Sequence, residues 1–599
     1  MTENPKTENG DLWDGTPPLA WAGSVSLGIG LWLLNGGTVA APPLVLWFAA
    51  FLILVGSAFL LIEGRRSFSD TRRLPSAFIL PLSIGLGLAV VLALREHSGR
   101  YLGFPFPLDD GEGFCLNQAL RIVKGHALYP PVGPAPYIVT NYPPLFPALL
   151  SVFIDPQRVS FFAGRFLSVV STIAICLASA GCVRIATGDS RAAWIAGLMV
   201  AASPIVYFWA ALLRVDVLAC ALGVIALWIA MRSKGPAVLW SLPLLLAAIF
   251  TRQSSIEAAV AIALGLFLSR EPDSLQPSGN RKYAYLLVAG WIVGLVLILL
   301  LLQNWSDGQY WLHTVTYTRT EFYWDRAVSN FVTIFKLHAV LFVIALFALP
   351  NALTDSRRRI IGIFFLASFA TALLSGKVGS DMNYFLNLTV AASCLAGFFA
   401  SDLFRAARSP LAASRLIGPA MLLIPAALIQ SGFLEGDRFN SFTPDRSAYN
   451  YSARVVEVLS SAKGPILCED EGYCMLSGHE VLFNPFIMSE LAGEGLWDQT
   501  PLIQSIQNKE FDLIMLRFWV DDPNHDDLPG IGTNAGWDRF TPEMERAISE
   551  NYELDPDAID LYATWDRYMR RRWFIYRPAT GNPPVRPDSP SGSDLLGNS

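Results

Sequence analysis

Three carboxylates lie within four residues of one another in the segment Pro107-Leu-Asp109-Asp110-Gly-Glu112-Gly-Phe, just before a helical stretch over 114–124. One interpretation is a helix N-terminus, where Asp109 or Asp110 caps the helix and Glu112 lies near the positive end of its dipole. The other is a functional site in which the carboxylates bind a metal ion or accept a proton as a general base. The two interpretations are compatible, and the residues alone leave both open.

Further polar residues that could take part in such a site occur at the ends of apolar segments. Charged side chains close to a membrane span are costly, so they indicate a function by default. The alternative is that they extend to the membrane interface or pair with one another, as Arg214 would with Asp216. Arginine suits bidentate contact with a phosphate, whereas a lysine acts as a point charge. The polar residues at the ends of the apolar segments that are candidates for the site are Arg165, Arg214, Asp216, Arg252, Lys377, Asn383 and Tyr384.

The elements that must position these residues are membrane helices. Of the 599 residues, 53% are hydrophobic and only 16% are charged, and the mean hydropathy is +0.40. An ordinary globular chain has about 25% charged residues. The composition therefore excludes a disordered chain, a coiled coil and a single soluble domain, and it predicts a polytopic membrane protein. The net charge of −6 argues against a nucleic-acid-binding protein.

Apolar runs long enough to cross a bilayer need roughly 20 residues. Basic residues occur in every second loop between the runs, as at Arg184, Arg232 and 357–359, which predicts that these loops and the N-terminus are cytoplasmic. The sequence predicts about thirteen spans, over 18–35, 42–63, 74–94, 160–183, 191–209, 213–231, 236–250, 254–269, 283–303, 332–350, 359–375, 384–404 and 415–433.

The predicted organisation has a membrane domain and a small domain outside the membrane. Apolar runs at 464–468 and 511–516 alternate with helical patterns, which favours an α/β domain. The predicted parts are a disordered cytoplasmic N-terminus over 1–17, a membrane domain over 18–434 with outer loops 95–159 and 304–331, an outer α/β domain over 435–576 and a disordered tail over 577–599.

Two features of the predicted outer domain leave alternatives open. Cys468 and Cys474 form either a disulfide, which an outer compartment permits, or two reduced and buried thiols. The acidic run Glu469-Asp-Glu471 between them is interpreted as a solvated turn rather than as a part of the site. In the loop 304–331, the aromatic residues form either an interfacial belt or a lid that stacks on a sugar; they are Trp305, Tyr310, Trp311, Tyr317, Tyr323 and Trp324.

Two motifs follow the acidic segment, and together they carry a family resemblance. Gly125-His-Ala-Leu-Tyr129 ends the helical stretch, and Asn141-Tyr-Pro-Pro-Leu-Phe-Pro147 leads into an apolar run. Their order and spacing over 105–150 resemble the first outer loop of the GT-C glycosyltransferases, in particular the protein mannosyltransferases and aminoarabinose transferases. The sequence departs from the family by Gly111, which separates Asp110 from Glu112 where the family often has adjacent Asp and Glu, and by two extra spans before this loop.

The resemblance implies an enzyme of the bacterial inner membrane that takes a hexosyl or pentosyl group from a polyprenyl-phosphate donor. The acceptor, a glycan, lipid or protein on the outer face, stays open, and inversion at the anomeric carbon is implied. Which carboxylate is the base also stays open. The implied site comprises Asp109, Asp110 and Glu112 for catalysis, Asp109 and Glu112 for a divalent metal (Mg²⁺ or Mn²⁺), and Arg252, Lys377, Arg214, Asp216, Arg165, Asn383, Tyr384 and Tyr142 for the donor phosphate and substrate.

Three other functions compete with this hypothesis. A transporter or flippase for a lipid-linked saccharide predicts internal repeats, and no convincing repeat is evident. A polysaccharide polymerase or O-antigen ligase places its key residues in a late outer loop, whereas the acidic segment here comes early. A scaffold without catalytic activity stays open. The sequence has neither a His-Glu-x-x-His zinc motif nor a phosphate-binding loop of the nucleotide-driven transporters.

Overall fold

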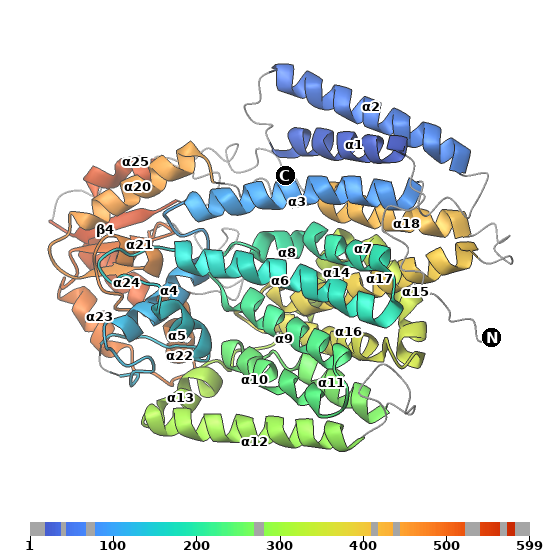
Figure 1. Ribbon diagram of the computed structural model, residues 1–599. Coiled ribbons are helices and arrows are strands. Elements are labelled where there is room, and N and C mark those ends of the chain that lie inside the picture. The colour runs from blue at the N-terminus through green and yellow to red at the C-terminus, as the bar shows by residue number, and fades with distance from the viewer. Residues whose placement is uncertain are drawn as a thin grey trace, which may run out of the picture.

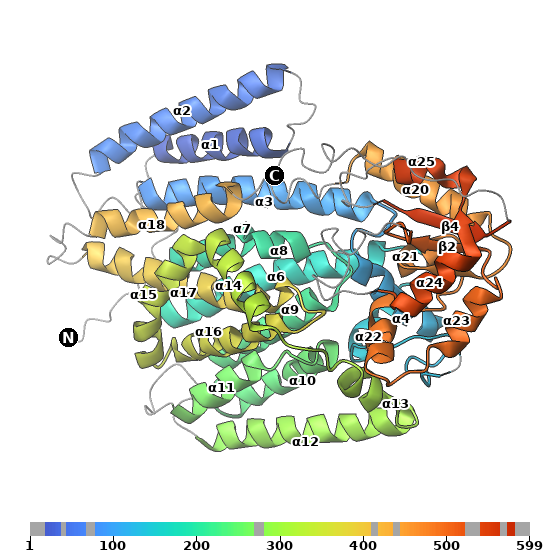
Figure 2. The ribbon, with the colours of Figure 1, turned by 180° about the vertical axis from the view of Figure 1, so that it is seen from behind.

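The computed structural model describes residues 18–36, 43–67, 78–133, 135–268, 281–408, 417–434, 444–521, 539–563 and 572–580. Its long helices run side by side, and the part that contains the β-sheet lies at one end of them (Figure 1). Seen from behind, the same helices form one body and the sheet again lies at a single end (Figure 2).

Each span predicted from hydropathy overlaps an apolar helical segment, although some spans consist of two successive elements. Among the described residues, seven helical segments are long and apolar enough to cross a membrane: Leu80–Gly103, Phe162–Thr187, Val215–Arg232, Arg281–Trp305, Trp324–Thr354, Arg359–Gly376 and Met382–Ala407. Six shorter apolar helices accompany them, at Pro18–Leu33, Phe48–Ile62, Ser190–Ala202, Gly235–Thr251, Glu257–Leu268 and Pro419–Phe433. The predicted fold class, a polytopic helical membrane protein with a small α/β part, is confirmed.

The membrane part consists mainly of α-helices, with short 3₁₀ and π segments at their ends. Its elements are α1 (Pro18–Gly36), α2 (Pro43–Ser67), α3 (Leu80–Gly103), α6 (Phe162–Thr187), α7 (Ser190–Ala202), α8 (Pro204–Trp209), α9 (Val215–Arg232), η2 (Gly235–Ser241), α10 (Leu242–Thr251), α11 (Glu257–Leu268), α12 (Arg281–Trp305), α14 (Trp324–Leu337), α15 (Ala339–Thr354), α16 (Arg359–Ala372), η4 (Leu373–Gly376), η5 (Met382–Phe385), α17 (Leu386–Arg408), α18 (Ile417–Ile429) and η6 (Gln430–Leu434).

One predicted span, over 191–209, is divided into α7 and α8. The division falls at Ser203, because Pro204 has no N–H with which to continue the hydrogen bonds of α7. The Ser203 hydroxyl caps the new helix by accepting a hydrogen bond from the N–H of Val206 at 3.4 Å. The break turns the chain so that α8 ends beside the site described below.

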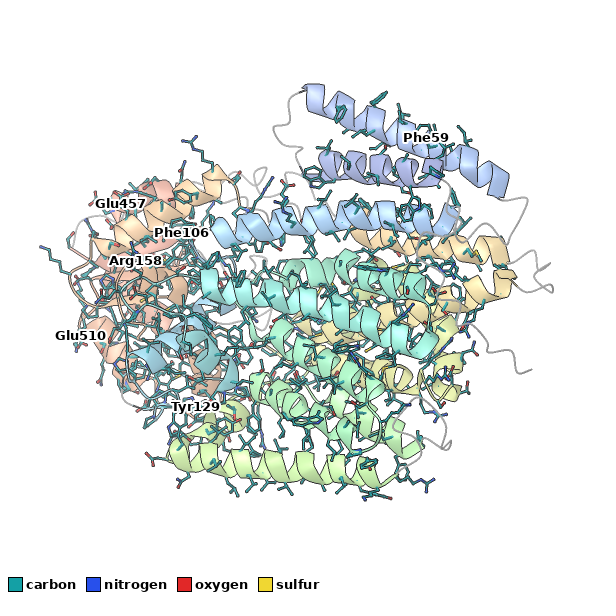
Figure 3. The ribbon with its side chains drawn as sticks, in the orientation of Figure 1. Phe59, Phe106, Tyr129, Arg158, Glu457 and Glu510 are labelled. Atoms are coloured by element: carbon teal, nitrogen blue, oxygen red, sulfur yellow. The ribbon has the colours of Figure 1, made fainter. Side chains whose placement is uncertain are left out.

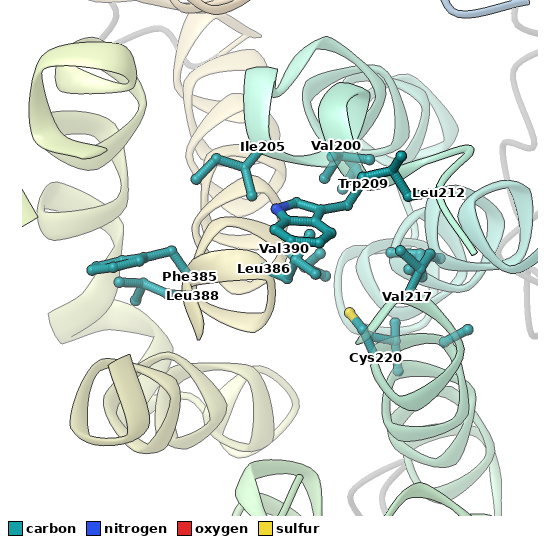
Figure 4. Packing of buried hydrophobic residues seen from close by; sticks show 14 of the residues in the cluster. Val200, Ile205, Trp209, Leu212, Val217, Cys220, Phe385, Leu386, Leu388 and Val390 are labelled. Atoms are coloured by element: carbon teal, nitrogen blue, oxygen red, sulfur yellow. The ribbon is translucent and has the colours of Figure 1, made fainter. Parts of the chain in front are cut away.

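Apolar side chains of α7, α8, α9 and α17 pack together in the core next to this site (Figure 4). Trp209 at the end of α8 is enclosed by its neighbours, with Val217 of α9 on one side and Leu386 and Val390 of α17 on another (Figure 4). Helix α12, by contrast, lies at the edge of the bundle and exposes apolar side chains along its length, as expected of a helix that faces lipid (Figure 1).

The two helices that precede α3 pack through glycines. A Cβ on Gly28 of α1 would lie 2.3 Å from the carbonyl oxygen of Gly85 of α3. A Cβ on Gly56 of α2 would lie 2.6 Å from the carbonyl oxygen of Gly23. Such close backbone contacts are typical of small residues between membrane helices. Helices α1 and α2 are the two extra spans relative to the simplest GT-C layout. They lie along one side of the bundle, away from the sheet (Figures 1 and 2).

The two long predicted outer loops, 95–159 and 304–331, called the first and second outer loop below, pack against each other. The first contains α4 (Asp110–Val123) and α5 (Leu145–Ser151), and the second contains α13 (Gln309–Trp311) and η3 (Leu312–Thr316). Tyr129 from the first loop contacts Tyr310 edge to face, with ring centroids 5.3 Å apart. His313 accepts a hydrogen bond from the N–H of Thr140 at 2.9 Å and contacts the carbonyl of Pro130 at 2.7 Å. Burial lowers the pKa of His313 to about 4, so the imidazole is neutral and its other nitrogen is the donor.

The domain that the sequence predicts to lie outside the membrane, called the outer domain below, contains a four-stranded sheet. The strand order is β1-β2-β4-β3, in which β1 and β2 are parallel and β4 is antiparallel to both its neighbours. In the parallel pair, Ile466 lies opposite Leu513. The strands β1 and β2 are fully buried, which explains their continuous apolar sequences. The elements are α20 (Arg446–Ser460), β1 (Ile466–Cys468), α21 (Glu471–Leu476), α22 (Pro485–Gly493), α23 (Thr500–Gln507), β2 (Leu513–Leu516), α24 (Pro542–Asn551), β3 (Tyr552–Leu554), η9 (Pro556–Ala558), α25 (Ile559–Ala563) and β4 (Phe574–Pro578).

Two cysteines of this domain lie close to each other as free thiols. Cys468 ends β1 and Cys474 lies in α21, and both are buried. The Sγ of Cys474 donates a hydrogen bond to the carbonyl oxygen of Glu480 at 3.2 Å. Of the two alternatives that the sequence left open, the structure contains the reduced pair.

Candidate active site

The acidic segment forms the N-terminus of α4, and its first carboxylate both caps the helix and stays accessible. The Oδ2 of Asp109 accepts hydrogen bonds from the N–H of Gly111 at 3.1 Å and from Nη1 of Arg214 at 2.7 Å. The Asp109 side chain is 27% exposed. Asp109 therefore satisfies one of the free N–H groups of the helix and stays partly exposed.

Glu112 is fully enclosed, and its carboxylate is surrounded by N–H donors. Its Oε1 accepts from Nε of Arg165 and from the N–H of Leu213, both at 2.8 Å. Its Oε2 accepts from Nη2 of Arg165 at 2.6 Å and from the N–H of Leu108 at 2.8 Å. Both side chains of the ion pair have an exposed fraction of 0%. Glu112 thus joins α4 to α6 and to the segment before α9.

The rest of the Arg165 guanidinium is also occupied by the protein. It donates to the carbonyl oxygens of Phe104 and Phe106, the latter at 2.7 Å, and to that of Tyr101 at 2.8 Å. These carbonyls end α3 and begin the loop that carries the acidic segment. Arg165, a candidate for substrate binding from its position near a span, is placed so that it holds this loop to α6.

Four of the predicted residues meet in a row that begins at Asp109. Arg214 contacts Asp109 with Nη1 and lies 3.7 Å from Oδ2 of Asp216 with Nε. Asp216 is 1% exposed, and its Oδ1 lies 3.2 Å from Nε of Arg252. The Nδ2 of Asn383 donates to the same oxygen at 2.9 Å. The Arg252 guanidinium lies over the ring of Tyr384, 4.3 Å from its centroid.

Tyr142 and Lys377 lie at the border of this row. Tyr142 is within electrostatic range of Arg214 and Asp216, and burial raises the pKa of its phenol, which stays a neutral hydrogen-bond donor. Lys377 donates to the carbonyl oxygen of Thr318 in the second outer loop and interacts electrostatically with Tyr384. The structure therefore brings all the predicted substrate-binding residues to one end of the bundle, with Arg165 on the buried side of α4.

Two arginines that the sequence did not indicate complete the surroundings of α4. Asp110 is ion-paired with Arg517, which follows β2, and its Oδ2 lies 2.7 Å from Nη2 of Arg539. Both arginines also pair with the buried Glu469, at 2.8 Å from Arg517 and 3.5 Å from Arg539. The only sequence signal for this contact is the position of Arg517 at the end of an apolar strand.

The acidic run after β1 is buried, so its interpretation as a solvated turn was wrong. The exposed fractions of Glu469, Asp470 and Glu471 are 3%, 1% and 5%. The cause is tertiary packing, because the run lies against α4. The Oε2 of Glu471 accepts from Nδ2 of Asn117 in α4 at 2.9 Å, and its Oε1 accepts from Asn484.

Burial raises the pKa of Glu471 to about 8, against the two amide donors, which favour the carboxylate. Because the unfolded chain releases this proton near pH 4.5 and the folded chain only near pH 8, the folded state binds more protons between these values. We therefore expect the free energy of unfolding to decrease as pH rises from about 4.5 to 8. The melting temperature of the purified protein at pH 5, 6.5 and 8 would show this decrease. Glu471→Gln should abolish the decrease. Glu457→Gln, which changes a carboxylate on the exposed surface (Figure 3), should leave the decrease as in the wild type. A wild-type decrease that persists in Glu471→Gln would contradict the assignment.

A divalent metal held by Asp109 and Glu112 does not fit this geometry. Both oxygens of Glu112 are surrounded by N–H donors, which a metal cation would have to displace, and Arg165 neutralises the charge. Within the part of the chain that the structure describes, no group of three or more His, Cys, Asp or Glu side chains is placed to hold a metal ion.

The aromatic residues of the second outer loop divide into two groups. Tyr310 is buried against Tyr129, and Tyr317 packs next to His313. The others are largely exposed, with 59% for Trp305 and 67% for Trp324. One role therefore does not fit all six aromatic residues. The interfacial belt and the sugar-stacking lid both stay predictions.

The fold is that of a polytopic membrane protein. At one end of its helices, a small α/β domain packs against the helix that begins at the partly exposed Asp109, near the guanidinium groups of Arg214 and Arg252. No family model and no curated protein matches this sequence. Among solved structures, the chain is similar to ArnT from Cupriavidus metallidurans in the apo state, with a TM-score of 0.53 and 12% identity over 82% of this chain and 97% of ArnT. The structure of the same protein bound to undecaprenyl phosphate has a TM-score of 0.53 and 12% identity over 81% of this chain and 97% of ArnT.

A further similar structure is the archaeal oligosaccharyltransferase AglB from Archaeoglobus fulgidus, in complex with an inhibitory peptide and a dolichol-phosphate. Its TM-score is 0.46, with 13% identity over 84% of this chain and 75% of AglB. At 12% identity, the similarity to ArnT shows the fold alone, and it agrees with the fold that the GT-C resemblance of the acidic segment and its neighbouring motifs implies.

Proposed function

We propose that this protein is a GT-C-type glycosyltransferase, which moves one sugar from a polyprenyl-phosphate donor to an acceptor on the outer side of the membrane. The observation that carries the proposal is the continuous row Asp109–Arg214–Asp216–Arg252 at the ends of the spans. A partly exposed carboxylate next to two guanidinium groups supplies a proton acceptor beside a phosphate site. The fold shared with ArnT supports the same conclusion.

In the proposed reaction, Asp109 is the group that accepts the proton. The acceptor hydroxyl attacks the anomeric carbon, its O–H bond breaks, and the proton passes to the Asp109 carboxylate as the new C–O bond forms. At the same time the bond from the anomeric carbon to the phosphate oxygen breaks, and polyprenyl phosphate leaves with the bonding electrons. Attack from the face opposite the leaving group inverts the anomeric configuration. Among the three carboxylates of the segment, Asp109 is favoured because Glu112 is enclosed and Asp110 is paired with two arginines.

The proposed role of Arg214 and Arg252 is to stabilise the phosphate as its negative charge grows. Both side chains lie at the outer ends of spans, with side-chain exposed fractions of 13% and 10%, so little water competes for their N–H groups. Guanidinium donors that are held in place before the reaction are effective because they need no rearrangement in the transition state. Asp216 and the ring of Tyr384 keep the Arg252 side chain in position.

Two buried oxygens beside these arginines could receive sugar hydroxyls. Oδ2 of Asp216 and Oδ1 of Asn383 have no hydrogen-bond partner among the described residues. Buried polar atoms are nearly always satisfied, so such a pair in one site indicates that a ligand or water supplies the missing donors. We propose that hydroxyl groups of the donor sugar do so.

We further propose that the site faces the periplasmic or extracellular side of a bacterial inner membrane, with the N-terminus in the cytoplasm. Helices α6 and α9 begin at the site and have Arg184 and Arg232 in their last turns, at the opposite end of the bundle. Helix α16 begins there with Arg359. Basic residues at one end of the spans favour that end as cytoplasmic.

The proposal is tested by incubating the purified protein with polyprenyl-phosphate sugars that carry a radiolabelled sugar, in the presence of a membrane or cell-envelope extract as the acceptor source. We expect label to leave the polyprenyl fraction only when active protein is present. A donor pool that stays intact with every sugar tested would contradict the proposal, and movement of the intact donor across a vesicle bilayer without transfer would support a flippase instead.

The glycine that distinguishes this acidic segment from the family provides a sharper test. A Cβ on Gly111 would lie 1.4 Å from Nη1 of Arg214, so the guanidinium could not remain on Asp109. Because only the end of a long side chain has to move, we expect Gly111→Ala to lower transfer about 10-fold or more while the melting temperature changes little. Gly99→Ala, at a helical position with open space around it, is the matched control. Full activity in Gly111→Ala would show that the Arg214–Asp109 contact is not needed.

A further inference from the structure

Helix α4 lies between the two parts of the molecule and contacts each with a different face. Asp110, Gly113 and Asn117 follow one another at intervals of three and four residues, so they share a face of the helix. Glu112 lies on another face, and there it contacts Arg165 of the membrane part. The helix that begins at Asp109 is therefore held from both sides.

All three residues of the first face contact the outer domain. Asp110 pairs with Arg517 and Arg539. A Cβ on Gly113 would lie 2.4 Å from the backbone nitrogen of Gly472, so the start of α21 lies directly against α4. Asn117 donates to Glu471, the first residue of α21.

The outer domain supplies these groups from one edge of its sheet. Glu469 directly follows β1, and Arg517 directly follows β2, and these two strands are parallel neighbours. Glu469 accepts a hydrogen bond from the N–H of Arg517 at 2.7 Å and pairs with its guanidinium at 2.8 Å. In sheets with parallel strands, the carboxyl ends of the strands are the usual place for functional groups. Here that edge faces α4.

We infer that Arg517 and Arg539 are positioning residues of the active site, which hold Asp110 and thereby set the position of the neighbouring Asp109. The inference rests on the proposed function and adds that the outer domain is an obligatory part of the active site rather than an appended module. The donor-phosphate residue Arg252 keeps its contacts to Asp216 and Tyr384, so the loss of Arg517 should leave it in place.

The test compares Arg517→Gln, Arg517→Lys and the wild type in steady-state transfer kinetics. We expect Arg517→Gln to lower kcat about 10- to 100-fold, because small displacements of a reacting group have effects of this size, with the KM for the donor within about twofold of wild type. Arg517→Lys, which keeps the charge, should restore part of kcat. Arg454→Gln, which removes an exposed ion pair of the same domain, is the matched control and should leave kcat unchanged.

A second readout does not depend on catalysis. Hydrogen exchange of the α4 amides over 112–118 should become faster in Arg517→Gln, while exchange in β1 and β2 stays as in the wild type. Unchanged kcat together with unchanged exchange in α4 would overturn the inference, and so would a loss that appears only in the KM for the donor. A wild-type protein without transfer activity would instead count against the proposed function, and the exchange experiment would still decide the positioning role.

Discussion

Replacing Asp109 by Asn is expected to lower the transfer rate about 10²- to 10⁴-fold, the usual contribution of a general base. The amide has nearly the shape of the carboxylate and is an equally good helix cap, so α4 should keep its start. The amide is neutral and cannot accept the proton that leaves the acceptor hydroxyl. The measurement is kcat for sugar transfer from a polyprenyl-phosphate donor, with the melting temperature as evidence that the fold persists.

Asp189→Asn is the matched control for this substitution. Asp189 is also a helix N-cap whose carboxylate pairs with an arginine, Arg191 at 3.1 Å, but it begins α7 at the opposite end of α6 from the site. Removing its charge should leave transfer unchanged. If Asp109→Asn retains more than about a tenth of the wild-type rate, then Asp109 is not the base, since such a base contributes at least about 10²-fold.

The second large effect is expected on stability, from breaking the pair of Glu112 and Arg165. Glu112→Gln or Arg165→Gln leaves one charge buried without its partner, which typically costs about 3–5 kcal/mol. We expect either variant to lower the melting temperature strongly and to reduce the yield of monodisperse protein. The double variant should lose less than the sum of the single losses, because it leaves no unpaired charge.

Glu457→Gln is the corresponding control, since Glu457 and Arg454 form an exposed pair on the outer domain with exposed fractions of 70% and 35% (Figure 3). Pairs of this kind contribute about 0–1 kcal/mol. A Glu112→Gln protein that is as stable as the wild type but has lost transfer would assign Glu112 to the reaction and contradict its role as a link between α4 and α6.

The membrane helices and the acidic segment could be predicted from the sequence because their signals are local. A span is recognised from its own 20 residues, and an N-cap from the few residues around it. The gathering of Arg214, Asp216 and Arg252 near one another also followed from counting crossings, since each opens or closes a span on the same side. The prediction of these parts of the fold and of the site required no knowledge of which helices contact one another.

The roles within the acidic segment could not be assigned in that way, because each depends on a partner far away in the sequence. Glu112 is enclosed by Arg165, which lies 53 residues further on, and by the N–H of Leu213, which lies 101 residues further on. Arg539 is 429 residues from Asp110, in a domain whose sequence has no recognisable motif for this contact. The buried state of Glu471 likewise depends on α4 as its neighbour. Contacts between residues so far apart in the sequence form only when the chain is folded.

The most direct test of the proposed function is the identity of the products formed from a defined donor. Wild-type protein and Asp109→Asn would each be incubated with undecaprenyl-phosphate sugars and an envelope extract, and the lipid fraction would be analysed by mass spectrometry. The account predicts that free undecaprenyl phosphate appears with the wild type, in equal amount to the sugar transferred, and not with Asp109→Asn. Equal release by both proteins, or no release by the wild type from any donor, would contradict it.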